Sequence, residues 1–399
     1  RPGARARSNR RQAGAGAVPA VGPLSAAWCR QAGCDCLSGG WGDVCWKTWE
    51  RSEHKGAAED VEYCDAHCHL DYILLNEKHD GMGWMRKKKM CYRWLGGYCF
   101  YGDTCDFAHG AEELTRREPL QVEDFDDFFR RYATNAGYPH QSEKSWSSQW
   151  SNEGSIGARP RLRCAITNCC EVEAIADTRL LLGSADRAMQ GVLYCTFGCH
   201  PHNYREYDDA YERRLLEAME VAGDKAVAWG ECGLDYHKNF YDASSRPLRE
   251  QMMEVFARQA RVAVARGLPL VVHTRDAEED TLTVLRENVP QDHPVHIHAY
   301  QGTIWMLDQI LASMPNVVVG VSGAATFAWR GNIDAIVRRC PLDRLVLETD
   351  APYLSREPSA IPRIAERVAE LRGDASAKEI LEITRRNCLR FYRIPGSGA

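Results

Sequence analysis

The residues of this sequence best suited to catalysis are histidines and carboxylates at, or just after, the ends of short apolar runs. They are His67, His69, His200, His202, Glu231, His273, His298 and Asp350. Mixed imidazole and carboxylate ligands suit Zn²⁺, Mn²⁺ or Fe²⁺, whereas Mg²⁺ prefers oxygen donors and retains bound water. We therefore expect a cluster of divalent cations, with Mg²⁺, Mn²⁺ and Zn²⁺ as the candidates.

Two ions close together need a bridging carboxylate, and Glu231 is the candidate because it ends a central apolar run. A metal pair lowers the pKa of bound water and holds the attacking and leaving oxygens of a phosphoryl displacement. Asp350 is expected to bind one ion and to accept the proton of that water. This pattern indicates hydrolysis of phosphodiesters.

His67 and His69 are separated by one residue. In extended chain their imidazoles leave on the same side, so both can bind one ion. A single histidine of this kind is more often a core or surface residue. Only the joint placement of ionisable residues at several strand ends favours a metal site.

Short apolar runs that alternate with longer segments of helical period predict an α/β fold, a (β/α)8 TIM barrel. The expected strands are 61–66, 162–168, 192–198, 225–230, 268–273, 294–298, 316–321 and 344–348. In such a barrel the carboxyl ends of all strands meet on one face, where active sites lie. Gly267 is expected to end one helix, and Ser376 with Glu379 predicts a capping box at the start of the last.

The domain organisation follows from composition and from one long gap. Residues 1–58 are rich in Gly, Ala, Arg and Ser without any period, so we expect a disordered tail. Residues 59–399 are expected to form the barrel. The gap between its first two strands indicates an insertion directly after the first strand, with a zinc finger at 84–110 and a loop at 137–158. Residues 122–133 have helical period and are expected to be the barrel's first helix.

The inserted segment has the spacing C-x7-C-x5-C-x3-H, formed by Cys91, Cys99, Cys105 and His109. Four such ligands can close a tetrahedral structural zinc site. The segment resembles the CCCH zinc-finger family, which implies single-stranded RNA as its ligand. The residues expected to contact phosphates or stack on bases are Arg86, Lys87, Lys88, Lys89, Tyr92, Phe100, Tyr101 and Phe107. For the basic residues a solvated linker is the alternative.

Five ordered blocks carry a second resemblance. They are DAHCHLD at 65–71, GCHPH at 198–202, GECGLDY at 230–236, HTRDA at 273–277 and LETDAPYL at 347–354. Together they resemble the TatD family of metal-dependent deoxyribonucleases. The resemblance implies a barrel of the amidohydrolase-like superfamily, a divalent-metal cluster and hydrolysis of nucleic acids, often from a 3′ end.

By position, the resemblance implies that His67, His69, Glu231 and Asp350 bind one ion. It implies that Glu231, His273 and His298 bind its neighbour. His200 and His202 would face the scissile phosphate, with Arg275 nearby. In the block around His298, only the histidine, an aromatic residue and a glycine of the family pattern are retained.

The net charge of −5 excludes a uniformly basic nucleic-acid coat, so polyanion binding must depend on local patches or bound cations. No apolar run is long enough to cross a membrane, and seventeen dispersed cysteines favour a reducing compartment, the nucleus or cytoplasm. Two other functions stay open: an amidohydrolase or lactonase acting on a small molecule, and a nonenzymatic RNA-binding protein. Protein partners are likewise left open.

Overall fold

The computed structural model describes residues 60–134, 156–237 and 246–396, apart from positions 80, 89, 92, 93, 95, 96, 116, 157, 189, 190, 329 and 330. The expected tail at 1–58 and almost all of the expected loop at 137–158 lie outside these residues. So do Lys89 and Tyr92, two of the residues expected to contact nucleic acid.

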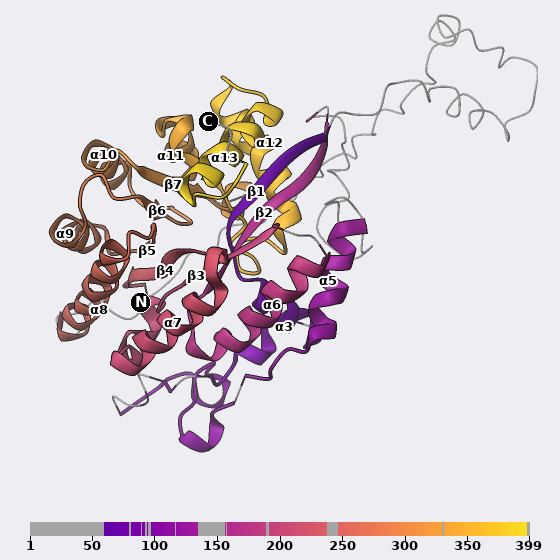
Figure 1. Ribbon diagram of the computed structural model, residues 1–399. Coiled ribbons are helices and arrows are strands. Elements are labelled where there is room, and N and C mark those ends of the chain that lie inside the picture. Colours follow the sequence, from indigo (N-terminus) through magenta and orange to yellow (C-terminus); the bar gives the residue numbers. More distant parts are fainter. Residues whose placement is uncertain are drawn as a thin grey trace, which may run out of the picture. The chain divides into compact units, whose positions relative to one another are not determined.

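Eight parallel strands form one sheet in the order of the sequence, with helices around them (Figure 1). They are β1 (Asp60–Cys68), β2 (Arg159–Cys169), β3 (Leu193–Phe197), β4 (Ala226–Asp235), β5 (Leu270–Arg275), β6 (Val295–Ile297), β7 (Val317–Val321) and β8 (Leu345–Leu347). The predicted (β/α)8 TIM barrel is confirmed, and all eight predicted strands are present. Most strand residues are buried, as expected where helices cover one face of the sheet and the other lines the barrel interior.

Backbone hydrogen bonds close the barrel at the carboxyl ends of β1 and β8. The N–H of Asp350 donates to the carbonyl of His67 at 2.9 Å, and the N–H of His69 donates to the carbonyl of Ala351 at 2.8 Å. The buried carboxylate of Asp65 accepts hydrogen bonds from the backbone N–H and the hydroxyl of Thr349. These bonds hold the end of β1, with His67 and His69, beside the residues that follow β8, with Asp350.

The described helices are α3 (Leu70–Lys78), α5 (Val122–Thr134), α6 (Ile175–Ala188), α7 (Asp209–Ala222), α8 (Arg246–Ala265), α9 (Glu278–Asn288), α10 (Ile304–Ser313), α11 (Ile333–Arg339), α12 (Ile361–Arg372) and α13 (Ala377–Phe391). The predicted capping box of α13 is confirmed, with the Ser376 hydroxyl accepting from the Glu379 N–H and the Glu379 carboxylate accepting from the Ser376 N–H. The predicted end of α8 is also confirmed, because Gly267 follows it with a φ of 62°. No helix among the described residues is long and apolar enough to cross a membrane.

The connection between β1 and β2 differs in one respect from the prediction. The helix α3 begins two residues after β1 ends, so the inserted segment follows this helix and not the strand itself. The predicted helix at 122–133 exists as α5, but it is the second α-helix in the described part of this connection. Sequence reasoning missed α3 because Leu70 to Leu75 form an almost continuous apolar run without a helical period, and all six residues are buried.

Candidate metal centre

Glu231 lies at the centre of the candidate site. It follows the apolar first half of β4, and its side chain is 3% exposed. Its two carboxylate oxygens face different neighbours, with Oε2 nearest to the histidines at the end of β1, which also lie near Asp350, and Oε1 nearest to histidines at the ends of β3, β5 and β6. We call these neighbours the first ligand group (His67, His69 and Asp350) and the second ligand group (His200, His273 and His298).

The first ligand group gathers around Oε2 of Glu231. Nε2 of His67 lies 3.3 Å and Nε2 of His69 lies 3.8 Å from this oxygen. The same two nitrogens lie 3.8 and 3.6 Å from Oδ1 of Asp350. Asp350 has a φ of 48°, a costly conformation for a residue other than glycine, and its N–H bond to the His67 carbonyl helps to hold it there.

The second ligand group gathers around Oε1 of Glu231. Nδ1 of His273 and Nε2 of His298 each lie 2.8 Å from this oxygen, and 3.0 Å from one another. Nε2 of His200 lies 3.6 Å from the same oxygen. The sequence prediction placed His200 at the phosphate, whereas the structure brings it into the same cluster as Glu231 and His273.

The spacing of these atoms fits metal ligation. Bonds of about 2.0–2.2 Å to nitrogen and oxygen put neighbouring ligand atoms roughly 3 to 3.5 Å apart, and the separations here range from 2.8 to 3.8 Å. Nε2 of His67, the ring nitrogen that faces Glu231, is buried and makes no hydrogen bond to any described residue. Buried polar atoms rarely lack a partner, so this unsatisfied nitrogen supports a bound cation.

Electrostatics also fit a cation at this position. Burial opposes ionisation of Glu231, yet His298, His200 and His273 hold its pKa well below the usual range. Burial lowers the pKa of His69, but Asp350 and Glu231 outweigh it and raise the pKa to about 9. Burial and the neighbouring His298 lower the pKa of His67 to about 3. The carboxylates therefore hold positive charge in this site, and His67 is neutral, as a histidine that binds a metal must be.

The two remaining residues predicted to contact the scissile phosphate lie at the edge of the site. The side chain of His202 is 56% exposed, and its Nε2 lies 2.9 Å from Oδ2 of Asp235. Arg275 is the last residue of β5 and is exposed. Neither residue contacts Glu231 in the described structure. Their expected roles require a bound substrate whose phosphate they would contact.

Sequence reasoning assigned no role to three buried residues of the site. Asp235 contacts His202 and also lies 3.4 Å from Nε2 of His273. The thiol of Cys170, just after β2, lies 3.8 Å from Oε2 of Glu231 and 3.9 Å from Nδ1 of His69. Glu348 lies 3.1 Å from Nε2 of His296, and burial raises its pKa to about 8. Asp235 has an available signal, since it follows Glu231 at an even spacing in one strand and so shares its side.

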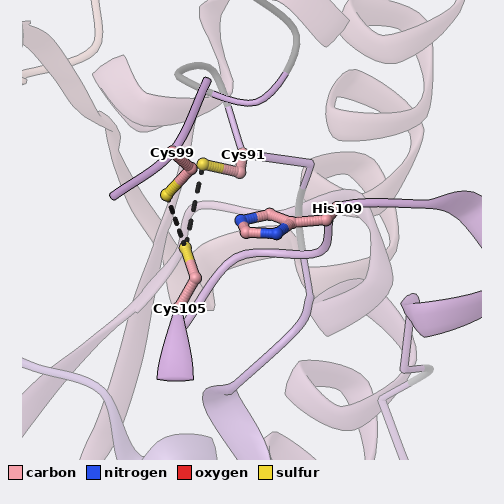
Figure 2. A group of neighbouring side chains, drawn as sticks. All are labelled: Cys91, Cys99, Cys105 and His109. Carbon is pink, nitrogen blue, oxygen red and sulfur yellow. Dashed lines mark hydrogen bonds between the residues drawn. The ribbon is translucent and has the colours of Figure 1, made fainter. Parts of the chain in front are cut away.

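The predicted structural zinc ligands come together in the inserted segment. Figure 2 shows the sulfur atoms of Cys91, Cys99 and Cys105 gathered together, with a nitrogen of the His109 ring facing them. Sγ of Cys105 lies 3.7 Å from that of Cys91 and 3.8 Å from that of Cys99. Zn–S bonds of about 2.3 Å at tetrahedral angles require a sulfur separation of about 3.8 Å. Nε2 of His109 is buried without a hydrogen-bond partner among the described residues.

The described basic residues at the start of the finger have neighbours in the finger or just after it. Arg86 Nε lies 3.0 Å from Asp106 Oδ1, and Lys87 Nζ lies 2.8 Å from Glu113 Oε2. Lys88 Nζ lies 5.9 Å from the ring centre of Trp84. Arg86 and Lys87 therefore hold the finger together, which is a role that the sequence did not predict.

The finger aromatics, in contrast, face solvent. The side chains of Phe100, Tyr101 and Phe107 are 60%, 52% and 46% exposed. Phe100 and Tyr101 lie with their ring centres 4.1 Å apart. These three rings are accessible to bases, as their predicted role requires.

An eight-stranded parallel barrel with histidines and carboxylates gathered at the carboxyl ends of its strands defines a (β/α)8 barrel with a candidate metal centre on the face where active sites of this fold lie. The family model of the TatD related DNase matches residues 156–393, and the chain belongs to this family. The match covers seven of the eight strands and begins after the inserted finger. It includes Glu231 and the whole second ligand group.

Individual relatives agree with the family match. The chain is 38% identical over 174 residues to the human 3′-5′ RNA nuclease TATDN2, a match that covers 44% of this chain and 22% of the human protein. It is 32% identical over 216 residues to the 3′-5′ ssDNA/RNA exonuclease TatD of Pectobacterium carotovorum, covering 50% of this chain and 79% of that protein. The chain thus spans about a fifth of the length of the human relative and most of the length of the bacterial one.

Solved structures support the fold. A TatD family hydrolase from Entamoeba histolytica superposes with a TM-score of 0.56 at 18% identity, covering 84% of this chain and 99% of that one. YJJV, a TatD homologue from Escherichia coli, superposes with a TM-score of 0.50 at 23% identity, covering 61% of this chain and 92% of that one.

Proposed function

We propose that the chain is a metal-dependent nuclease that hydrolyses phosphodiester bonds of single-stranded DNA or RNA, removing nucleotides from a 3′ end. One observation carries the proposal: the two oxygens of Glu231 face two separate groups of ligand side chains. Glu231 would hold divalent cations together with both groups, and such ions would supply an activated water and stabilise charge on a phosphate. The names of the human and bacterial relatives, which are 3′-5′ nucleases, support nucleic acid over a small amide or lactone as the substrate.

The first ligand group would hold one divalent ion, and His273, His298 and His200 would hold the other, each with one oxygen of Glu231. Bound cations of this kind activate water and stabilise charge that develops on a phosphate. The chemistry of the donor set favours Zn²⁺ or Mn²⁺ over Mg²⁺, because most of the ligands are imidazoles.

The protein's own groups supply orientation and proton transfer. Asp350, which has one oxygen near His67 and His69, is the base that accepts the proton of the attacking water. His202, held by Asp235 and partly exposed, would donate to a phosphate oxygen at the mouth. Arg275 at the end of β5 would neutralise a neighbouring phosphate.

The segment 84–110 would bind one structural Zn²⁺ and support the grip on the nucleic acid. Zinc supplies the folding energy that so small a unit lacks. Its exposed rings at Phe100, Tyr101 and Phe107 would stack on unpaired bases. The thirteen cysteines among the described residues are all free, which supports a reducing compartment such as the nucleus or cytoplasm.

The test compares the wild type with Glu231→Gln on 3′-labelled and 5′-labelled single-stranded DNA and RNA, each with Mg²⁺, Mn²⁺ or Zn²⁺. The control is Glu287→Gln, the same change at an exposed position of α9. We expect the wild type and the control to shorten the strands stepwise and Glu231→Gln to lose at least a hundredfold in rate, a typical cost of removing an essential catalytic group. Equal rates in all three proteins would contradict the proposed function.

A further inference from the structure

Exposed aromatic side chains have an uneven distribution in this protein. Among the described residues, the largely exposed aromatic rings are Trp94, Tyr98, Phe100, Tyr101, Phe107, Trp305 and Tyr353. Five of these belong to the finger. The other two lie on the barrel, and both follow a strand that carries a candidate ligand: Tyr353 comes three residues after Asp350, and Trp305 comes seven residues after His298. The exposed rings of the barrel are therefore at its catalytic face.

Tyr353 connects the surface with the candidate metal centre. The residue is 42% exposed, yet its ring meets the buried ring of His69 edge to face, with centres 5.6 Å apart and planes at 84°. It meets Tyr72 in the same way, with centres 6.1 Å apart. Tyr72 in turn lies parallel to the ring of His69 at 5.3 Å. The exposed ring of Tyr353 is thus held against two buried rings.

The backbone that carries this ring is also held in place, because the N–H of Tyr353 donates to the carbonyl of Asp350 at 2.9 Å. A ring that is already ordered loses little conformational entropy when it binds a ligand, and stacking then adds directly to affinity. An exposed aromatic ring in a fixed position beside a metal ligand is suited to a flat partner close to the reacting bond.

A second aromatic contact extends from Tyr72 toward the finger. The ring of Trp84 lies 5.2 Å from that of Tyr72, and its Nε1–H donates to Oδ1 of Asn76 at 2.6 Å. Trp84 lies two positions before Arg86, at the start of the segment 84–110. Aromatic rings therefore continue from the candidate metal centre to the start of the finger, a pattern typical of proteins that bind single strands by stacking.

We propose that Tyr353 stacks on the base of the nucleotide next to the scissile phosphate, so that the enzyme selects an unpaired base and not a particular base. This inference rests on the proposed function and adds one requirement to it: the base next to the scissile phosphate must be unpaired. Stacking is tolerant of sequence because every base has a π-face. A base inside a duplex has both faces covered by its neighbours, so this contact favours single strands and frayed ends.

The test uses two single-stranded oligonucleotides that differ only in the terminal 3′ nucleotide, which carries a base in one and is abasic in the other. The variants are Tyr353→Leu, which removes the ring, and Tyr353→Phe, which retains it. We expect the wild type to prefer the base-bearing strand by about tenfold or more in kcat/KM, Tyr353→Phe to keep this preference, and Tyr353→Leu to lose it.

Because Tyr353 touches His69, the leucine variant also tests a purely structural role. If the loss in kcat/KM were the same on both oligonucleotides, the ring would act through His69 and the stacking inference would be wrong. The inference would also be wrong if Tyr353→Leu kept the wild-type preference. A second readout is the fluorescence of 2-aminopurine at the 3′ end, which stacking quenches. It is measured in the Glu231→Gln background, and Tyr353→Leu should restore the emission.

Failure of the proposed function gives a different result. A wild type that cleaves neither oligonucleotide contradicts the nuclease activity. The fluorescence measurement then decides the stacking inference alone, since it requires binding and not cleavage. A wild type that cleaves both strands equally well contradicts only the stacking inference.

Discussion

Nε2 of His298 lies 2.8 Å from Oε1 of Glu231, although the two residues are 67 positions apart and His298 stands in the block that departs most from the family pattern. The strand β6 ends just before His298, and β4 carries Glu231. Because both strands point to the same face of the barrel, the changed residues around His298 do not move its ring away from the site. We therefore regard His298 as a ligand of the same standing as His273.

The first prediction concerns the number of bound ions. His298→Ala removes one ligand of the second group and leaves the first group intact, so the protein should retain one barrel ion and the finger zinc. We expect metal analysis of the dialysed protein to give about three ions for the wild type and about two for the variant. His79→Ala, a change near the surface at the end of α3, is the control and should keep all three. An unchanged metal content in His298→Ala would contradict the assignment.

The second prediction concerns protons. Burial lowers the pKa of His273, but Asp235 and Glu231 outweigh it and raise the pKa to about 10, while the pKa of His69 is about 9. At pH 7 both imidazoles of the metal-free protein are therefore in the positively charged form, with a proton on each ring nitrogen. Ligation requires neutral imidazole, so metal binding must release protons, and affinity should rise as the pH increases from 7 toward 9.

Calorimetry in two buffers with different ionisation enthalpies measures this release. We expect at least one proton per protein at pH 7 and less at pH 9. A binding enthalpy that does not depend on the buffer at pH 7 would show that the histidines are already neutral, and the predicted rise of affinity with pH would then be absent.

The third prediction concerns the finger. Cys105 contacts both other thiols, so Cys105→Ser should lose the structural zinc while the barrel keeps its ions and its fold. Loss of the metal should unfold the finger and make the segment 84–110 sensitive to trypsin. We expect the affinity for a long single strand to fall about tenfold, since stacking on exposed rings is lost, while a dinucleotide should be cleaved as before.

Cys195→Ser is the matched control, because Cys195 is buried in β3 outside any cluster of metal-ligand residues found in the described structure. Its zinc content and strand affinity should equal those of the wild type. If Cys105→Ser bound long strands as tightly as the control, the finger would have no part in substrate binding.

Much of the fold and the site could be predicted from the sequence, for a specific reason. Buried parallel strands are continuous apolar runs, and barrel topology alone brings their carboxyl ends together. His67 and Asp350 could therefore be assigned to one place although they are 283 positions apart. The same logic extends to Asp235, which has an even spacing from Glu231. It lies beyond the last residues of the apolar run, and the sequence prediction for this strand ends with Glu231.

Other features depend on tertiary contacts that no local pattern carries. The basic residues at the start of the segment 84–110 predict phosphate contacts. In the structure Arg86 has Asp106 as its partner, 20 positions away, and Lys87 has Glu113, 26 positions away. Cysteine is a common core residue, so the sequence gives no sign of a role for Cys170. Only the structure places its thiol beside Glu231. The partners of such charges and thiols are distant in the sequence and come together only when the chain folds.

The last prediction concerns Asp235, which faces both His202 and His273. Asp235→Asn removes a buried negative charge and keeps the size of the side chain, so the pKa of His273 should fall toward its usual value. Fewer protons then compete with the metal at pH 7, and the proton release defined above should decrease. At the same time His202 loses its carboxylate partner, so its orientation toward a phosphate should weaken and kcat should fall about tenfold or more. Asp308→Asn, which affects only a surface ion pair with Arg339, is the control. A variant with unchanged proton release and unchanged kcat would mean that Asp235 serves only the packing of β4.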